Sequence, residues 1–295
     1  MNKIQTWLST RQGRLLAHDA ALAAGVGVAA WQASGGDWTW GAFTAAGVVA
    51  AKAFLRLILP VPGKTTRLKA YPAVYHHRLP ERPIPGRALG RHVHHDERSK
   101  AYPFHAGPTS ALKSIRHKRH VGVYNQGDVG SCTGNAGAGS LSTAPFTHRY
   151  TESKALKLYS AAEVIDGDGP YPPNDNGSSG LSIAKVCKSE GLIGSYSHCF
   201  SAEAVYTALQ TGPVMVGVNW LTGFDNPTAD GQMIYKGSSR GGHELCMDEI
   251  DVENQRVWIC NSWSSSWGIE GRAWWSFADF AKVLADQGDA TVLDR

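Results

Sequence analysis

The sequence predicts an α+β domain over residues 88–295, preceded by a basic and partly apolar front. Helical patterns come first in this region and short apolar strand patterns follow, an order typical of α+β folds. Charge is unevenly divided, because residues 1–120 carry 18 Lys and Arg against 5 Asp and Glu, whereas residues 121–295 carry 11 against 20. The apolar share of 42% excludes a disordered or fibrous chain.

Residues 1–60 are predicted to form an apolar helical hairpin. Two apolar runs, 20–33 and 38–60, are separated by a Ser-Gly-Gly-Asp turn signal at 34–37. The first run is shorter than the roughly 20 residues that a membrane span needs, and two basic residues interrupt the second. Positive charge outside both runs would place both termini on the cytoplasmic side of a membrane. The alternative is a cytoplasmic protein whose helical pair packs on the rest of the chain.

Residues 61–87 are rich in Pro, Arg and aromatic residues, which predicts an extended linker. Together with residues 1–60, this positive charge suits an anionic membrane surface. No nucleic acid is expected, because aromatic and basic residues do not alternate here. Further on, His92, His94 and His95 are candidate metal ligands, but clustered His without matching Cys or carboxylates more often forms a solvated strand or loop. We therefore predict no metal and no cofactor.

From residue 88 the predicted elements separate into a helical half and a strand half. A Gly-rich segment is expected to lead into a first helix that ends at residue 142. Further helices are expected at 154–164, 182–189 and 203–210. The last of these ends at Gly212-Pro213, which cannot continue a helix. Apolar strand patterns follow at 214–218, 243–250, 256–260 and 274–277. A turn at Glu253-Asn254 would make the second and third strands antiparallel neighbours.

Cys132 lies in a Gly-rich turn directly before the first predicted helix. Gly127 and Gly130 allow a tight loop, and the small residues after Cys132 allow the helix to pack closely. A Cys at a helix N-terminus faces the positive end of the helix dipole, which stabilises a thiolate. The alternative is a buried structural Cys.

His243 stands at the head of one predicted strand, and Asn261 stands at the end of its predicted neighbour. Two antiparallel strands joined by a turn would bring these side chains together. A lone His at a strand start is more often structural. The combination of Cys132 with His243 and Asn261 indicates nucleophilic catalysis.

These residues resemble the papain-like cysteine peptidases, a family whose Cys/His/Asn arrangement is well established. The matching segments are Gln126-Gly127, Gly130-Ser131-Cys132, Gly242-His243, Asn261-Ser262-Trp263, Ser266-Trp267-Gly268 and Gly271. The resemblance covers roughly residues 88–295 and leaves 1–87 uncovered. The Gly-Ser-Cys-Thr-Gly-Asn-Ala motif looks like that of bacterial and phage members.

The resemblance implies a fold of two subdomains, one helical with the nucleophile and one of antiparallel strands with His and Asn. Cys132 would be a thiolate paired with the imidazolium of His243. Asn261 would orient the imidazole, and Trp263 would cover the bond between them. The Gln126 side chain and the Cys132 N–H would form the oxyanion hole.

The resemblance also assigns residues to substrate binding. The segment from Asn176 to Gly180, including Ser179, looks like the loop that lines the substrate cleft. Leu181, Gly217 and Glu244 map near the main specificity pocket. The family usually prefers a bulky apolar side chain two residues before the cut. Glu244 could shift that preference, which the sequence leaves open.

The chain also departs from the family pattern. Val129 replaces a frequent Cys, and Thr133 replaces a frequent aromatic residue. His243 and Asn261 follow the nucleophile by 111 and 129 residues, where the family has roughly 130–150. A shortened domain is therefore expected, and the missing Cys suits a reducing compartment.

The other four Cys are predicted to be structural. Cys246 and Cys260 are expected to be buried thiols in apolar strands, and Cys187 and Cys199 could form a disulfide.

The expected function is that of a cysteine-type endopeptidase that acts on a peptide or protein substrate, with residues 1–87 as a membrane tether. Two other classes remain open. One is a catalytically inactive papain-like binding module. The other is a holin-like membrane protein with an accessory peptidase domain. Related acyl transfer would use the same residues as proteolysis.

Overall fold

The chain divides into two units, residues 1–70 and 71–295, and the computed structural model describes the second unit from residue 74 onward. The predicted hairpin over 1–60 and the predicted linker up to residue 73 lie outside the described residues. Within 74–295 we find no helix that has both the length and the apolar character of a membrane span. Every candidate catalytic residue belongs to the described unit.

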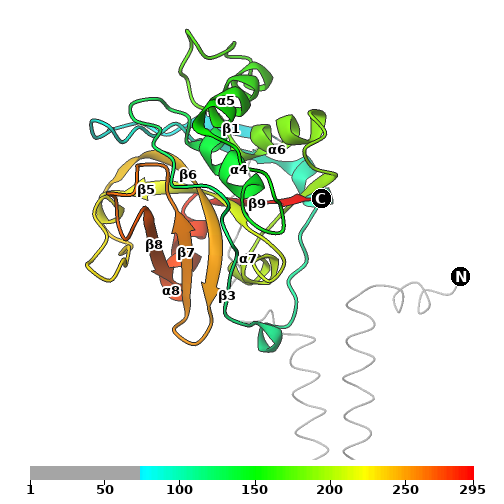
Figure 1. Cartoon of the computed structure of the whole chain (residues 1–295), viewed down its shortest axis with the longest axis vertical. Helices are drawn as coiled ribbons and strands as arrows, with labels where there is room; N and C mark the ends of the chain where they lie inside the picture. Colours follow the sequence, from blue (N-terminus) through cyan, green and yellow to red (C-terminus); the bar gives the residue numbers. More distant parts are fainter. Residues whose placement is uncertain (1–73) are drawn as a thin grey trace, which may run out of the picture. The chain divides into compact units, whose positions relative to one another are not determined.

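In the described unit, an antiparallel sheet and a group of helices lie side by side (Figure 1). The helices are α4 (Cys132–Leu141), α5 (Glu152–Asp166), α6 (Gly180–Ser189), α7 (Ala202–Ala208) and α8 (Phe277–Ala285). The strands are β1 (Val74–Arg78), β2 (His92–Asp96), β3 (Ile115–Arg116), β4 (Ser195–His198), β5 (Val214–Leu221), β6 (Ser239–Asp251), β7 (Arg256–Cys260), β8 (Arg272–Ser276) and β9 (Asp289–Asp294). Short 3₁₀ helices span Glu97–Ala101, Thr109–Ala111 and Thr222–Phe224.

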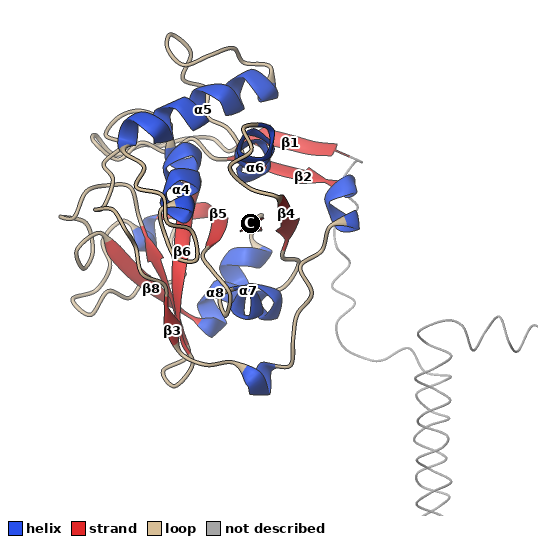
Figure 2. Cartoon of the chain, turned by 45° about the vertical axis from the view of Figure 1, so that its right-hand side comes forward, coloured by secondary structure: helices blue, strands red, loops and turns tan. Residues whose placement is uncertain are grey.

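The helical subdomain consists of α4, α5 and α6, with α4 packed against the other two and along β6 (Figure 2). Local signals set the helix ends. Gly167 has φ 91°, a left-handed conformation that commonly ends a helix and here ends α5. The Ser179 hydroxyl accepts a hydrogen bond from the Ser182 N–H and so caps the start of α6. These ends direct the 168–179 loop back toward the start of α4.

The main sheet has the strand order β4-β9-β5-β6-β7-β8, with β3 paired on β6, and every pairing is antiparallel. The central strand β5 is buried along its whole length, which explains its continuous apolar run. Val216 and Val218 join the core shared with α7 and α8, whereas Met215 joins the core under α5 and α6. The sheet therefore separates two apolar cores.

The α+β prediction is confirmed, and the four predicted strands correspond to β5, β6, β7 and β8. No sequence pattern predicted α8, β3, β4 or β9. Phe277, predicted to end a strand, instead begins α8, because Ser276 caps that helix by accepting from the Asp279 N–H. β4 is half-exposed and polar, so it lacks an apolar pattern.

β1 and β2 form an antiparallel hairpin that pairs Val74 with Asp96 and Arg78 with His92. β1 falls within the range predicted as a linker. The expectation of a solvated strand at His92, His94 and His95 is wrong in one respect, since His92 is buried and the other two are half-buried. Five His in ten strand residues give no apolar alternation, so the pattern could not indicate burial.

Candidate active site

Cys132 is the first residue of α4 and is fully buried. All ten residues of α4 are buried, and their small size allows close packing. A Cβ atom on Gly134 would collide with the Ala155 carbonyl oxygen and lie 2.8 Å from the Tyr159 Cβ. Gly137 faces the Ile183 side chain in the same way. The small residues after Cys132 therefore set how closely α4 approaches α5 and α6.

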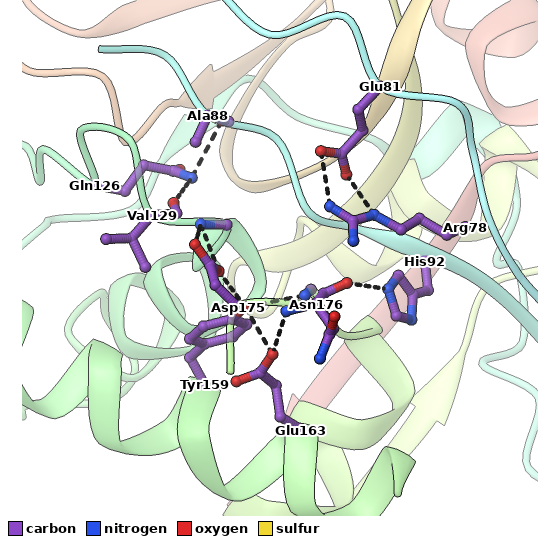
Figure 3. A network of polar contacts seen from close by, with 12 residues as sticks. Arg78, Glu81, Ala88, His92, Gln126, Val129, Tyr159, Glu163, Asp175 and Asn176 are labelled. Atoms are coloured by element: carbon purple, nitrogen blue, oxygen red, sulfur yellow. Dashed lines mark hydrogen bonds and ion pairs between the residues drawn. The ribbon is translucent and has the colours of Figure 1, made fainter. Parts of the chain in front are cut away.

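A polar network holds the turn before Cys132 against the loop before α6 (Figure 3). The Asp175 carboxylate accepts from the Gly130 N–H at 3.0 Å and from the Tyr159 hydroxyl at 2.6 Å. Glu163 accepts from the same hydroxyl at 3.0 Å and from the Asn176 N–H at 2.6 Å. Helix α5 thus connects the loops on both sides of the site. Tyr159, Glu163 and Asp175 carry no motif of their own, so their role could not be predicted from the sequence.

His243 in β6 lies beside Asn261, which directly follows β7, because Cys246 and Cys260 pair across these strands. His243 Nε2 and Asn261 Oδ1 are 2.8 Å apart. The same oxygen accepts from the Ser262 N–H at 2.8 Å, so the amide oxygen faces the ring and Nε2 donates. The Nδ1 atom is therefore the acceptor nitrogen, and it makes no hydrogen bond to any of the described residues in this closed arrangement.

Two tryptophans enclose the imidazole of His243. The Trp263 ring stacks on it with centroids 4.6 Å apart, and Trp220 meets it edge-on at 5.0 Å. Both indoles are buried, as are His243 and Asn261. The hydrogen bond between His243 and Asn261 is thereby shielded from water, which strengthens it.

Gln126 is fixed from both ends of its amide, and Figure 3 shows the two bonds of its nitrogen. Its oxygen accepts from the Ser262 hydroxyl at 2.6 Å. Its nitrogen donates to the Val129 carbonyl at 2.9 Å and to the Ala88 carbonyl at 3.2 Å. One amide N–H is therefore taken by the turn before Cys132, and the other is taken by Ala88.

Burial shifts the pKa values of the two reacting groups in opposite directions. Burial and the Glu244 carboxyl raise the pKa of the Cys132 thiol, while backbone hydrogen bonds from Glu244 and Thr133 oppose this. Burial lowers the pKa of His243 to about 4, against a smaller opposing effect of the Asn261 hydrogen bond. Both groups are therefore neutral near pH 7 in this closed arrangement. The backbone contact with Glu244 places the thiol beside the residue that follows His243.

Residues 82–92, which we call the covering segment, lie across these groups. The Ala88 carbonyl also accepts from the Trp263 indole N–H at 3.2 Å. The Gly90 and Arg91 N–H groups donate to the Gly242 carbonyl at 3.1 and 3.0 Å. On the other side, the Ser178 N–H donates to the Gly90 carbonyl, and the Ser178 carbonyl accepts from the His92 N–H. The segment thus bridges the start of β6 and the 176–180 loop.

The residues expected to bind substrate have distinct positions. Ser179 caps α6 and lies 3.0 Å from His94 Nδ1. Gly180 begins α6, and a Cβ there would lie 2.6 Å from a Glu244 carboxylate oxygen. Leu181 is buried in α6. Gly217 pairs with the buried Glu244 across β5 and β6.

On the side of the 176–180 loop, the backbone bonds to the covering segment come from Ser178, which lies within the segment predicted to line the substrate cleft. The Asn-Gly pair before it was the available signal, since it marks the turn that presents this backbone.

The His side chains of the β1–β2 hairpin bond to protein groups. His76 Nε2 lies 2.9 Å from His92 Nδ1, and His92 Nε2 lies 2.7 Å from the Asn176 carbonyl oxygen (Figure 3). Ligand atoms of His76, His94 and Asp166 lie within 4.8 Å of one another, but the Asp166 oxygens already accept from two serine hydroxyls.

The five cysteines are buried and free. Cys187 and Cys199, considered as a disulfide pair, are both thiols whose pKa values burial raises to about 12.

Comparison with known proteins identifies the fold. No family model matches the chain, and no curated protein matches its sequence. Among solved structures, xylellain, a cysteine protease from Xylella fastidiosa, aligns with a TM-score of 0.59 and 17% identity, over 73% of this chain and 98% of that one. A digestive procathepsin L from Tenebrio molitor covers 65% and 73% (14% identity, TM-score 0.49). A procathepsin B from Trypanosoma congolense covers 70% and 87% (10% identity, TM-score 0.49). The likeness to xylellain shows that residues 74–295 have the papain-like fold.

Proposed function

We propose that the chain is a cysteine endopeptidase that hydrolyses peptide bonds in a peptide or protein substrate. One observation carries this proposal. The His243–Asn261 hydrogen bond lies buried under Trp263, and the Cys132 thiol lies at a helix start beside the backbone of the next β6 residue. This arrangement supplies a nucleophile, a base and a residue that orients the base.

The proposed reaction begins with transfer of the Cys132 proton to His243 Nδ1. The thiolate attacks the peptide carbonyl, and the Gln126 side-chain N–H and the Cys132 N–H stabilise the oxyanion. His243 then returns the proton to the departing amine, which leaves a thioester on Cys132. Water adds to the thioester after His243 removes its proton, and the second product leaves as a carboxylic acid while the thiol is restored.

Substrate access requires the covering segment to move. In the closed arrangement the Ala88 carbonyl takes the Gln126 donor, and Cys132 and His243 are both fully buried. Displacement would admit water and so remove the desolvation that keeps both groups neutral. The thiolate–imidazolium pair is therefore a property of the open form.

We further propose that residues 1–87 attach the protein to an anionic membrane with both termini cytoplasmic, as in a bacterial or phage protein. The support is the sequence alone, with its two apolar runs and their flanking positive charge. After carbonate extraction of cells that express the full-length protein, the membrane fraction should retain it. Recovery of the whole chain in the soluble fraction would leave a cytoplasmic protein.

The first test of the peptidase is cleavage of a quenched peptide library by the full-length protein under reducing conditions. Cleavage should be abolished in Cys132→Ala, because the thioester cannot form. A peptide-based epoxide should label the wild type at Cys132 and leave the variant unlabelled.

Equal labelling of both proteins would reject Cys132 as the nucleophile. A folded wild type that reacts with neither reagent would favour the inactive binding module, whereas reaction with the epoxide alone would favour another acyl transfer.

A further inference from the structure

Arg91 is the most deeply enclosed cation of the covering segment, and it is 0% exposed. Its guanidinium forms an ion pair with Asp289 at the start of β9 and donates to the Gln287 carbonyl at 2.8 Å. Its Nε lies 4.0 Å from a Glu244 carboxylate oxygen. A segment that only lay on the protein surface would leave the guanidinium of Arg91 exposed to water.

Glycines make the space that Arg91 fills. A Cβ on Gly217 would lie 2.5 Å from Arg91 Nε, 2.8 Å from Asp289 and 2.8 Å from Glu244. A Cβ on Gly242 would collide with the Arg91 backbone, and one on Gly180 would lie 2.6 Å from Glu244. Larger residues at these three glycine positions would fill the enclosure. The glycines together therefore leave room for one long side chain.

The two carboxyl groups have no other cation in the described part of the chain. Neither Glu244 nor Asp289 forms an ion pair there except with Arg91. Glu244 is 1% exposed, and neither of its carboxyl oxygens makes a hydrogen bond. Burial and Asp289 raise the pKa of Glu244, and Arg91 opposes that shift. Departure of Arg91 would leave the buried Glu244 and the half-buried Asp289 without a counter-ion, a costly state that another cation would relieve.

The enclosure lies directly beside the proposed catalytic base, because two of its residues flank His243 in β6. Glu244 follows His243 in β6, and Gly242, which holds the Arg91 backbone, precedes it. The enclosure also contains Gly217 and Glu244, two residues that the family resemblance assigns to the pocket for the side chain two residues before the cut.

We propose that Glu244, Asp289 and the surrounding glycines form a specificity pocket for a cationic side chain of the substrate, and that Arg91 occupies this pocket while the covering segment is in place. The proposal rests on the proposed peptidase function and specifies its substrate class. Peptides with Arg or Lys two residues before the cleaved bond are preferred over those with an apolar residue. This differs from the apolar preference usual in the family.

The test uses the full-length protein and two peptidyl chloromethyl ketones that carry Arg or Leu two residues before the ketone. Mass spectrometry follows alkylation of Cys132, and iodoacetamide, which has no such side chain, reports thiol access. We expect the Arg reagent to react faster by roughly 30-fold or more, as for other buried charge pairs. Asp289→Asn should greatly reduce this preference. Asp294→Asn, the same change at the far end of β9, should preserve it.

A second comparison tests whether Arg91 occupies the pocket and anchors the covering segment. Arg91→Met should increase the rate of Cys132 alkylation by iodoacetamide, because the segment loses its anchoring ion pair. Arg82→Met, the same change at an exposed position of the segment, should leave the rate near that of the wild type. An unchanged rate in Arg91→Met would overturn the role of Arg91 as occupant.

Failure of the pocket and failure of the peptidase give different results. Equal reaction of both ketones, or a preference that survives Asp289→Asn together with Glu244→Gln, overturns the cationic pocket and leaves the peptidase intact. Alkylation by iodoacetamide with no reaction of either ketone and no peptide cleavage overturns the peptidase itself.

Discussion

The side-chain oxygen of Asn261 determines which nitrogen of His243 is left to accept a proton. It accepts from the Ser262 N–H and lies 2.8 Å from Nε2, so Nε2 carries a hydrogen and Nδ1 does not. Ser262 also donates its hydroxyl to Gln126, and a single residue thereby orients both the base and the oxyanion donor. Three neighbouring residues in sequence, Asn261 to Trp263, organise most of the site.

At this scale we expect Gln126→Ala to lower kcat for peptide cleavage by about 100-fold, because one oxyanion donor is lost. The rate of Cys132 alkylation by iodoacetamide should not fall, since alkylation forms no oxyanion and the variant also removes one of the two side-chain donors to the Ala88 carbonyl. Steady-state kinetics and alkylation rates on the same preparation separate the two effects. A parallel fall in both would instead indicate a disturbed Cys132.

The packing of helix α4 is determined by the small size of its side chains. Its residues are small because α5 and α6 pack against it at close range, and its first residue carries the thiol. Sequence signals placed this helix, α5 and α6 within two residues of their observed starts, since caps and glycine ends are local. They could not indicate the β1–β2 hairpin, whose His side chains bond to loops that lie far away in sequence.

For this element we expect Gly134→Ala to destabilise the protein, although Ala favours a helix over Gly by about 1 kcal/mol. The new Cβ would collide with the Ala155 backbone, and such overpacking typically costs about 1–3 kcal/mol. Gly139→Ala is the matched control, because its nearest neighbour is the end of the Arg119 side chain, which can move. Urea unfolding of both variants measures the difference. Equal stability of the two would contradict the close α4–α5 contact.

Across the whole described molecule, the covering segment and the β1–β2 hairpin, whose two strands it connects, contact both subdomains. Arg91 and Gly90 bond to β6 and β9 on one side, and His92 and His94 bond to the 176–180 loop on the other. Burial is the largest cause that lowers the pKa of His94, to about 4, and it lowers that of His92 as well. The closed arrangement therefore favours the neutral forms of His92 and His94.

Acidification should accordingly destabilise the folded, closed molecule. A histidine whose pKa is about 4 when folded and near 6.5 when exposed is neutral in both states above pH 6.5, so its effect begins below that value. Between pH 6.5 and 4 the unfolded state binds more protons, so the free energy of unfolding falls as pH falls. Glu244 and Glu163, whose pKa values burial raises, oppose this trend.

Glu244 and Glu163 are present in both the wild type and His94→Gln, so their effects cancel when the free energies of unfolding of the two proteins are compared at each pH. Wild type should lose more stability than the variant between pH 6.5 and 4.5, measured by urea unfolding at each pH. Identical pH profiles would show that His94 is not coupled to the closed fold.

The sequence by itself determined the types and order of the chemical groups. Cys132 after a Gly-rich turn and His243 and Asn261 at adjoining strand ends follow from short-range patterns, and the residues around them resemble one family. Tertiary structure alone decided that Arg91 is enclosed by Glu244 and Asp289, which lie 153 and 198 residues away in sequence. Burial and ion pairing between such distant residues depend on how strands and loops pack, and no local pattern encodes that packing. The sequence therefore identified the reacting groups, and the fold showed what covers them.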